Sequence, residues 1–153
     1  MALHLSEIGP DGQLAESFTP GEILPSVVTA MLDVYQQTGF VRPWIGYVAL
    51  RAGECIGTCA FKSPPKDGQV EIAYFTFPGH ERQGVATAMA RELLRIAAQA
   101  DASVRVTAQT LREENASTAI LTKLGFLRTG IAQDHEAGEV WVWELPTSSS
   151  RGE

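Results

Sequence analysis

Residues 79–94, GHERQGVATAMARELL, place a glycine-containing loop directly before an amphipathic pattern. A helix start leaves its first amide N–H groups without partners and carries about half a positive charge, so a loop that wraps these amides around one point binds an anion. Gly84 lets a phosphate approach the backbone, Ala86 keeps the next turn clear, and Arg82 adds a full positive charge. No acidic residue between Arg82 and Arg91 competes with that anion. The stretch therefore predicts a phosphate-binding loop.

A carboxylate lies on the segment that leads into this loop. The residues VEIAYFTF (70–77) alternate like a strand and end at a Pro-Gly pair. Glu71 faces away from its apolar neighbours there, so it is a candidate general base, although a solvent-facing strand glutamate fits the same pattern. His80 and Glu81 flank the loop and are weaker candidates.

Apolar periodicity divides the chain into helices and strands that would position these residues. Three- and four-residue spacing of apolar residues predicts helices, whereas two-residue alternation and β-branched enrichment predict strands. The expected helices cover 24–40, 85–100 and 115–126, and the expected strands lie in 44–62 (two, around a turn at Ala52 and Gly53), 70–77, 104–111, 126–132 and 139–145.

The order of these elements predicts the site's place in the fold. Strand 70–77, helix 85–100 and strand 104–111 form a β-α-β unit, whose two strands run parallel. The helix then begins beside the C-terminal end of the first strand, where ligands bind in such sheets. The two strands in 44–62 and strand 70–77 predict an antiparallel meander. We therefore expect an α/β (α+β) fold with a mixed, mainly antiparallel central sheet flanked by helices.

The third helix carries recognisable end signals. Asn115 is the expected N-cap, and Gly125 is the expected left-handed residue after the helix. Phe126 is then expected to fold back on Leu121, as in a Schellman motif.

Composition limits the function. The chain has 153 residues, 44% of them apolar, which predicts a single domain over 1–145 with a disordered tail at 146–153. Its net charge of −6 argues against a nucleic-acid partner. Neither a signal peptide nor an apolar run of about 18 residues occurs, so we expect a cytoplasmic protein without membrane association.

The cysteines and histidines do not indicate a disulfide or a metal site. Cys55 and Cys59 lie about 13 Å apart along an expected strand, too far to form a disulfide. His4, His80 and His135 are isolated, so no metal is expected.

Neither a P-loop nor a dinucleotide-binding glycine motif occurs in the chain. The segment ERQGVA (81–86) instead resembles motif A of the GNAT superfamily of N-acetyltransferases, Q/R-x-x-G-x-G/A, with Glu81 at the usual Arg or Gln position. Residues 61–94 and ENASTAILTKLGF (114–126) are similar to the small bacterial branch that resembles ribosomal-protein N-terminal acetyltransferases. This resemblance covers roughly residues 44–145.

The resemblance implies that acetyl-CoA is the co-substrate and that its pyrophosphate binds the loop amides. It implies backbone contacts from strand 70–77, which in the family carries a bulge that splays it from its parallel neighbour, and side-chain contacts from the second motif. The expected CoA-binding residues are Phe75, Thr76, Phe77, Arg82, Gln83, Gly84, Val85, Ala86, Thr87, Asn115 and Thr118.

The catalytic residues carry over less directly. Many relatives place a tyrosine general acid two residues before the Lys of K-L-G-F, where this chain has Leu121. Tyr74 is a replacement by proximity only, and a packed strand aromatic fits equally well; Trp141 and Trp143 are most simply sheet residues. In the family the first helix and the loop after it, roughly 24–44 with Tyr35, form one wall of the acceptor site.

These inferences lead to one function and one alternative. We expect direct transfer of an acetyl group from acetyl-CoA to a primary amine, either on a small molecule or at a protein N-terminus, with a homodimer left open. The alternative is a catalytically silent acyl-CoA-binding or regulatory module, which the substituted Glu81 and the missing tyrosine favour.

Overall fold

A computed structural model describes residues 3–18, 22–134 and 137–146 of the chain. These residues form one seven-stranded sheet with the strand order β1-β2-β3-β4-β5-β7-β6 and three helices. In chain order the elements are β1 (His4–Glu7), α1 (Leu24–Thr38), β2 (Gly46–Arg51), β3 (Glu54–Phe61), β4 (Gln69–Thr76), α2 (Val85–Ala100), β5 (Arg105–Leu111), α3 (Ala116–Lys123), β6 (Leu127–Asp134) and β7 (Gly138–Leu145).

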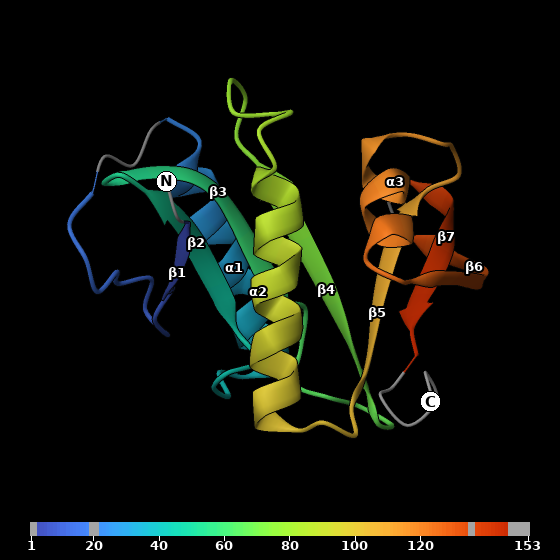
Figure 1. The fold of residues 1–153 in the computed structure, drawn as a ribbon. Coiled ribbons are helices and arrows are strands. Elements are labelled where there is room, and N and C mark those ends of the chain that lie inside the picture. Colours follow the sequence, from blue (N-terminus) through green and yellow to red (C-terminus); the bar gives the residue numbers. More distant parts are fainter. Residues whose placement is uncertain (1–2, 19–21, 135–136, 147–153) are drawn as a thin grey trace.

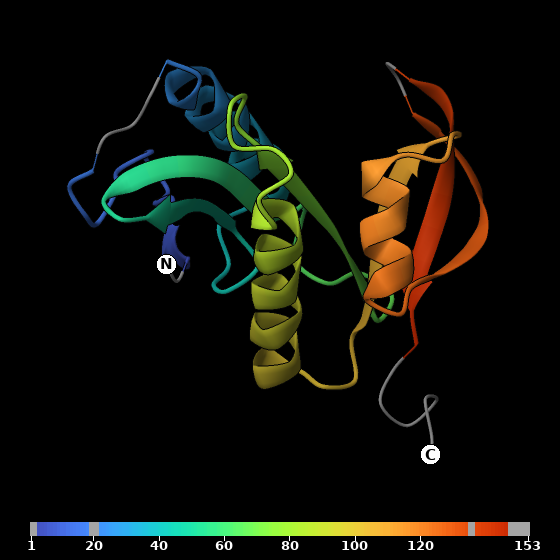
Figure 2. The ribbon, with the colours of Figure 1, turned by 45° about the horizontal axis from the view of Figure 1, so that its top comes forward.

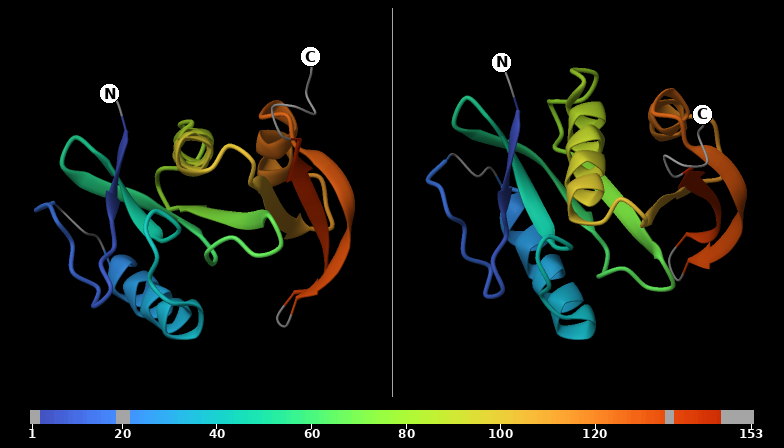
Figure 3. Two further views of the ribbon diagram at one scale, coloured as in Figure 1. Left: turned by 90° about the horizontal axis from the view of Figure 1, so that it is seen from below. Right: turned by 60° about the horizontal axis from the view of Figure 1, so that its bottom comes forward.

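The sheet is mixed and mainly antiparallel, which confirms the expected fold class. Among the described strands, β4 and β5 form the one parallel pair. The helix α2 connects them, as the β-α-β prediction requires, and Figure 1 shows it standing in front of the sheet. Seen along the sheet, α2 and α3 lie on one face and α1 lies on the other (Figure 3). The fold therefore has three layers.

The antiparallel meander of β2, β3 and β4 is also confirmed. The turn between β2 and β3 falls at Ala52 and Gly53, with φ angles of 53° and 78°, which matches the positive φ values of a tight hairpin turn. A register shift opposite Ala49 and Leu50 leaves Ile56 without a partner residue and places a bulge in β3. The ladder between β3 and β4 runs without a shift from Gly57 opposite Thr76 to Phe61 opposite Ile72.

The parallel ladder between β4 and β5 is short. It pairs three positions, ending at Glu71 opposite Thr107, whereas β4 continues to Thr76 beside β3. Beyond that point the strands diverge toward the upper edge of Figure 1 and the same gap opens in Figure 2. The splay expected from the family is therefore present, but the β3–β4 ladder has no bulge beside it.

The helix α2 covers the sheet with an apolar face. Its buried residues include Met89 and Leu93, which are both fully shielded from solvent, and Ala97. A Cβ atom at Gly57 would lie 3.2 Å from the Met89 side chain and 2.7 Å from the Phe75 carbonyl oxygen. Gly57 therefore permits the close contact between β3, β4 and α2.

The two ends of α3 follow the predicted pattern. The Asn115 side chain accepts a hydrogen bond from the Thr118 amide, at 3.2 Å, and caps the helix. Gly125 has a φ of 97°, and the Phe126 amide donates to the Leu121 carbonyl at 2.9 Å. Phe126 and Leu121 are both buried, so the Schellman motif and its apolar contact are confirmed.

The remaining sequence predictions have mixed outcomes. The strand β1 was not predicted, and its connection to β2 is reinforced by the Tyr35 hydroxyl, which donates to Ile8 O at 2.7 Å. Cys55 and Cys59 are free and buried, and Trp143 is a buried sheet residue, as expected. None of the helices in the described ranges combines the length and apolar character that a membrane crossing requires. The predicted disordered tail lies, from residue 147 on, outside the described residues.

Replacing Leu93 with alanine tests the α2 contact with the sheet. Leu93 is completely buried, so Leu93→Ala should lower the free energy of unfolding by about 2–5 kcal/mol in urea denaturation. The matched control is Leu127→Ala, because Leu127 is 60% exposed and its loss should change stability by about 0.5 kcal/mol or less. Similar effects of the two substitutions would contradict this account of the core.

Candidate active site

A groove of about 1040 Å³ lies at the open end of the β4–β5 gap, between β4, the loop after it, and the starts of α2 and α3. It contains eight of the predicted site residues, namely Tyr74, Phe75, Thr76, Arg82, Gly84, Val85, Ala86 and Thr87. The five other predicted residues, Glu71, Phe77, Gln83, Asn115 and Thr118, do not line it. The groove therefore unites the predicted phosphate loop with the end of the predicted catalytic strand.

The loop has the backbone geometry of an anion cradle. Arg82 and Gly84 have φ angles of 65° and 77°, so the chain twice adopts the left-handed conformation before α2. Ala88 is the first α2 residue whose N–H donates to the backbone, to Gly84 O at 3.0 Å. Within the described part of the chain, no acceptor takes the N–H groups of residues 82–87. The loop therefore presents a series of unpaired amides beside the groove.

A Cβ atom built on Gly84 would have no atom within 4 Å, so the space beside this residue is empty. The Arg82 side chain is exposed and forms no ion pair with any described carboxylate. The site thus offers room at the backbone and a free positive charge, which together suit a phosphate group.

Contacts with the β2–β3 hairpin hold the loop in place. The Arg51 guanidinium donates to the Gln83 side-chain oxygen at 2.7 Å, and His80 Nε2 lies 3.6 Å from the Glu54 carboxylate. The Glu81 carboxylate accepts a hydrogen bond from the Gly79 amide at 2.8 Å. Bonds from its own amide and from that of Gly79 lower the pKa of Glu81. The side chains of Gln83 and Glu81 therefore brace the loop.

The direction of the backbone groups in β4 follows from two hydrogen bonds. The Lys62 amide donates to Glu71 O, and the Phe77 amide donates to Ile56 O, both at 2.9 Å. Because neighbouring residues in a strand point their backbone groups to opposite sides, the odd-numbered residues of β4 bond to β3. Tyr74 and Thr76 consequently direct theirs into the gap that β5 has left. Of the three residues expected to supply backbone contacts, this geometry favours Thr76, and it adds Tyr74.

Tyr74 lies at the centre of the site. It lines the groove, a cavity of about 110 Å³ between β4 and β5, and a third hollow on the α1 face of the sheet. Its hydroxyl has no hydrogen-bond partner among the described residues. Burial raises the pKa of Tyr74 to about 12. The phenol therefore keeps its proton at neutral pH and is available as a hydrogen-bond donor.

Glu71 lies in the small cavity and has a charged neighbour that the sequence did not reveal. Its Oε2 atom is 2.8 Å from Lys62 Nζ, and Lys62, the residue directly after β3, lies opposite Glu71 of β4. The Glu71 side chain is 23% exposed, and Oε2 itself is buried without a hydrogen bond of normal geometry. The contact is therefore an ion pair by distance.

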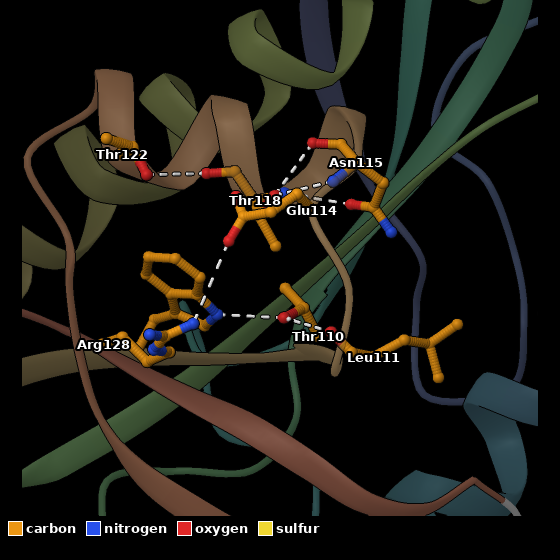
Figure 4. Close-up of polar contacts among 8 residues, drawn as sticks. Thr110, Leu111, Glu114, Asn115, Thr118, Thr122 and Arg128 are labelled. Carbon is orange, nitrogen blue, oxygen red and sulfur yellow. Dashed lines mark hydrogen bonds and ion pairs between the residues drawn. The ribbon is translucent and has the colours of Figure 1, made fainter.

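Figure 4 shows how the residues at the start of α3 are engaged. The Thr118 hydroxyl accepts from the Asn115 amide and donates to the Asn115 carbonyl, both at 2.9 Å, and Thr118 is 1% exposed. Thr110 and Thr122 also bond backbone carbonyl groups, of Leu111 and Thr118 respectively. The side chains of Asn115 and Thr118 thus cap the helix. Ser117, which was not predicted, lines both the groove and the small cavity.

The third hollow, of about 250 Å³, lies between α1 and strands β3 and β4. The helix lines it with Val27, Ala30, Met31 and Val34, so α1 does form a wall on this face. Tyr35 does not contribute, because its ring is buried in the core and its hydroxyl bonds Ile8 O and accepts from the Gly46 amide. We find no group of three or more His, Cys, Asp or Glu residues in 3–18, 22–134 and 137–146 that could hold a metal ion.

The three-layer fold, the splayed parallel pair and the loop at the start of the crossover helix agree with the family that the sequence motifs resemble. The family model described as "Acetyltransferase (GNAT) domain" matches residues 6–127, and the chain belongs to this family. Members of this family are generally acetyl-CoA-dependent acyltransferases. No curated protein sequence matches the chain.

Solved structures of bacterial acetyltransferases share the fold. RimJ of Mycobacterium smegmatis in complex with CoA-disulfide has a TM-score of 0.65 at 20% identity, covering 84% of this chain and 63% of RimJ. The ribosomal-protein-S5-alanine acetyltransferase of Vibrio fischeri has a TM-score of 0.63 at 12% identity, and the match covers 83% of this chain and 72% of that protein. The IAA acetyltransferase of Bacillus cereus has a TM-score of 0.68 at 14% identity, and the match covers 94% of this chain and 99% of that protein. The chain thus spans less than two thirds of RimJ, and at these identities the likeness concerns the fold.

The raised pKa of Tyr74 predicts a dependence of stability on pH. The folded state holds this phenol proton more tightly than the unfolded chain, where tyrosine titrates near 10. The resulting stabilisation should be complete below about pH 10 and should disappear as the pH rises through about 12. Absorbance titration should show a tyrosinate component near pH 12 that Tyr74→Phe removes. A Tyr74 component with a midpoint near 10 would show that the ring is accessible to solvent.

Proposed function

We propose that the protein transfers an acetyl group from acetyl-CoA to a primary amine by direct attack. The observation that carries this proposal is the series of unpaired amides at residues 82–87, which opens on a groove that continues into the β4–β5 gap. The empty space at Gly84 fits a diphosphate, and the groove volume of about 1040 Å³ leaves room for a thioester arm. When bound, acetyl-CoA supplies an acyl carbon that an amine can attack.

The residues of this chain would then perform three tasks. The amides at 82–87 and Arg82 hold the diphosphate, as derived from their geometry. The backbone N–H groups of Tyr74 and Thr76, which point into the gap, are the donors for the thioester oxygen. Glu71 takes a proton from the incoming ammonium group, and the Tyr74 hydroxyl donates a hydrogen bond to the departing sulfur.

The pKa of Tyr74 determines whether its hydroxyl transfers a proton to the departing sulfur or only donates a hydrogen bond to it. A thiol has a pKa of about 8.5, whereas the Tyr74 phenol has a pKa of about 12. Complete proton transfer from the phenol to a thiolate is therefore uphill, and a hydrogen bond to the sulfur is the better description of its role. Loss of this hydroxyl should accordingly cost less than loss of the base.

No feature of the site favours the silent binding module over the enzyme. The two functions differ in turnover, because a binding module would hold acetyl-CoA without releasing free thiol in the presence of amines. Thiol release across a library of amines therefore tests the proposed function. A cytoplasmic location and a homodimer stay predictions.

Replacing Gly84 with valine tests the cradle. Gly84→Val should raise the Kd for acetyl-CoA at least about 100-fold in calorimetry, because a branched side chain would fill the space beside the loop amides. The substitution also introduces strain, since φ is 77°. Gly68→Val is the matched control, because Gly68 has the same φ and no atom within 4 Å of its Cβ position but does not line the groove. Equal affinities of the two variants would place the diphosphate elsewhere.

Replacing Glu71 with glutamine tests the base. Glu71→Gln keeps the shape of the side chain and should lower turnover at neutral pH by about 10²- to 10⁴-fold, with partial recovery at high pH where the amine is already neutral. The matched control is Glu144→Gln, since Glu144 is also a partly buried strand residue paired with a cation, Arg105 at 3.6 Å. Nearly full activity of Glu71→Gln at all pH values would exclude Glu71 as the base.

A further inference from the structure

The hollow on the α1 face is apolar along its length and charged at one end. Cross-strand pairs of β3 and β4 form its floor, with Thr58 opposite Phe75 and Ala60 opposite Ala73. The α1 wall adds only apolar side chains. Lys62 is the one charged residue among the described residues that line it, and no carboxylate lines it directly. This composition disfavours polycationic acceptors, which would bring several ammonium groups to a surface without acids.

Lys62 connects this hollow with the reaction site. It lines both the α1-face hollow and the small cavity between β4 and β5, where its ammonium lies 2.8 Å from Glu71 Oε2. The pair lies just beyond the β3–β4 ladder, two residues and about 7 Å further along the strands than Ala60 and Ala73 and on the same face. The two alanines leave open space between this pair and the middle of β4.

The ion pair imposes a condition on the acceptor. When Glu71 takes a proton from a bound ammonium, it becomes neutral, and Lys62, whose side chain is 49% exposed, loses its ion-pair partner. A simple amine brings no second anion to this end of the hollow, where Lys62 is the one charged residue among the described residues. An acceptor with its own carboxylate next to the amine restores the balance, because the carboxylate pairs with Lys62 while the ammonium faces Glu71.

We propose that the acceptor is a zwitterionic α-amino acid with an apolar side chain. Its carboxylate binds Lys62, its amine lies between Glu71 and Ala73, and its side chain occupies the hollow beneath α1. The volume of about 250 Å³ suits one aliphatic side chain and is smaller than the sites of drug-sized ligands. A protein N-terminus fits less well, because a peptide bond replaces the carboxylate. This inference rests on the proposed function and on Glu71 as its base.

The reaction balances with the groups named. The ammonium gives one proton to Glu71, and the neutral nitrogen forms a bond to the acyl carbon of acetyl-CoA. The carbon–sulfur bond then breaks, and the second proton lost by nitrogen goes to the sulfur. The products are the N-acetyl amino acid and CoA thiol, and Glu71 returns its proton to water.

The first comparison uses two acceptors that have the same side chain, one with and one without a carboxylate next to the amine. L-leucine and L-leucinamide have the same apolar group, but the amide has no negative charge. At saturating acetyl-CoA, kcat/KM from thiol release should be at least about tenfold higher for leucine. The amine of leucinamide is less basic, so more of it is neutral at pH 8, and this difference acts against the expected result. Equal values, or a preference for leucinamide, would overturn the proposal.

The second comparison assigns the preference to Lys62. Lys62→Met should reduce kcat/KM for leucine to about the leucinamide value while leaving the acetyl-CoA Kd unchanged, and Lys62→Arg should keep the preference. Lys66→Met is the matched control, because Lys66 is an exposed residue of the same connection and lines no part of the site. With an unchanged acetyl-CoA Kd, a proportional loss for both substrates in Lys62→Met would overturn the proposal, since it would show that Lys62 does not distinguish the carboxylate from the amide.

The outcomes separate this inference from the function on which it rests. Acetylation of other amines, such as spermidine or a tripeptide N-terminus, with no preference for the leucine carboxylate would overturn the amino-acid acceptor and leave the proposed acetyltransferase intact. No thiol release with any amine would overturn both.

Discussion

The early end of the parallel ladder between β4 and β5 is the constraint on which the site depends. A strand inside a sheet normally has all its backbone groups paired, because unpaired buried groups are costly. Here the pairing stops at Glu71 and Thr107, and the groups that Tyr74 and Thr76 direct toward β5 find no strand. The gap persists because each strand is secured on its other side, β4 by β3 up to Thr76 and β5 by β7 from Val106 to Leu111. The opening is therefore a rigid feature of the sheet.

An acidic chain can bind an anionic ligand only through interactions that act at close range. The net charge of −6 repels a diphosphate at long range, but unpaired amides act at close range, where their partial charges are not screened. The acids around the loop are also occupied. Glu54 lies near His80, and the Glu81 carboxylate accepts the Gly79 amide. The loop thus combines unpaired amide donors with neighbouring carboxylates that already contact other groups of the protein.

The sequence predicts most elements and the cradle because local interactions determine them. Helix α2, its glycine start and both ends of α3 depend on residues within one or two turns, and all were expected with nearly the observed bounds. Strand β1 was missed because HLSE is short and does not alternate clearly, and its pairing with β2 decides its conformation. The expected acceptor-site role of Tyr35 could not be corrected from the sequence, since helical spacing alone does not say which face meets the core.

The catalytic details depend on which neighbour each strand residue faces, and this is not a local property. Backbone direction in β4 became known only from the bonds at Lys62 and Phe77, and these shift the expected contacts from Phe75 and Phe77 toward Tyr74 and Thr76. The Lys62–Glu71 pair was also missed. A signal for it exists, because both residues flank the predicted turn at 63–68 and would face each other in a tight hairpin, but their nine-residue separation made the register uncertain.

In the proposed reaction, a single strand therefore keeps the two substrates apart through the alternation of its side chains and of its backbone groups. Along β4, the side chains of Glu71, Ala73 and Phe75 point to the α1 face, while the backbone groups of Tyr74 and Thr76 point into the gap on the way to the cradle. An acceptor on the α1 face and a thioester in the gap can then meet at the middle of the strand without competing for the same groups. A shift of the β3–β4 register by one residue would exchange these directions and bring the base to the wrong face. The unbroken ladder from Gly57 to Phe61 is thus as necessary to the proposed chemistry as the residues that carry it out.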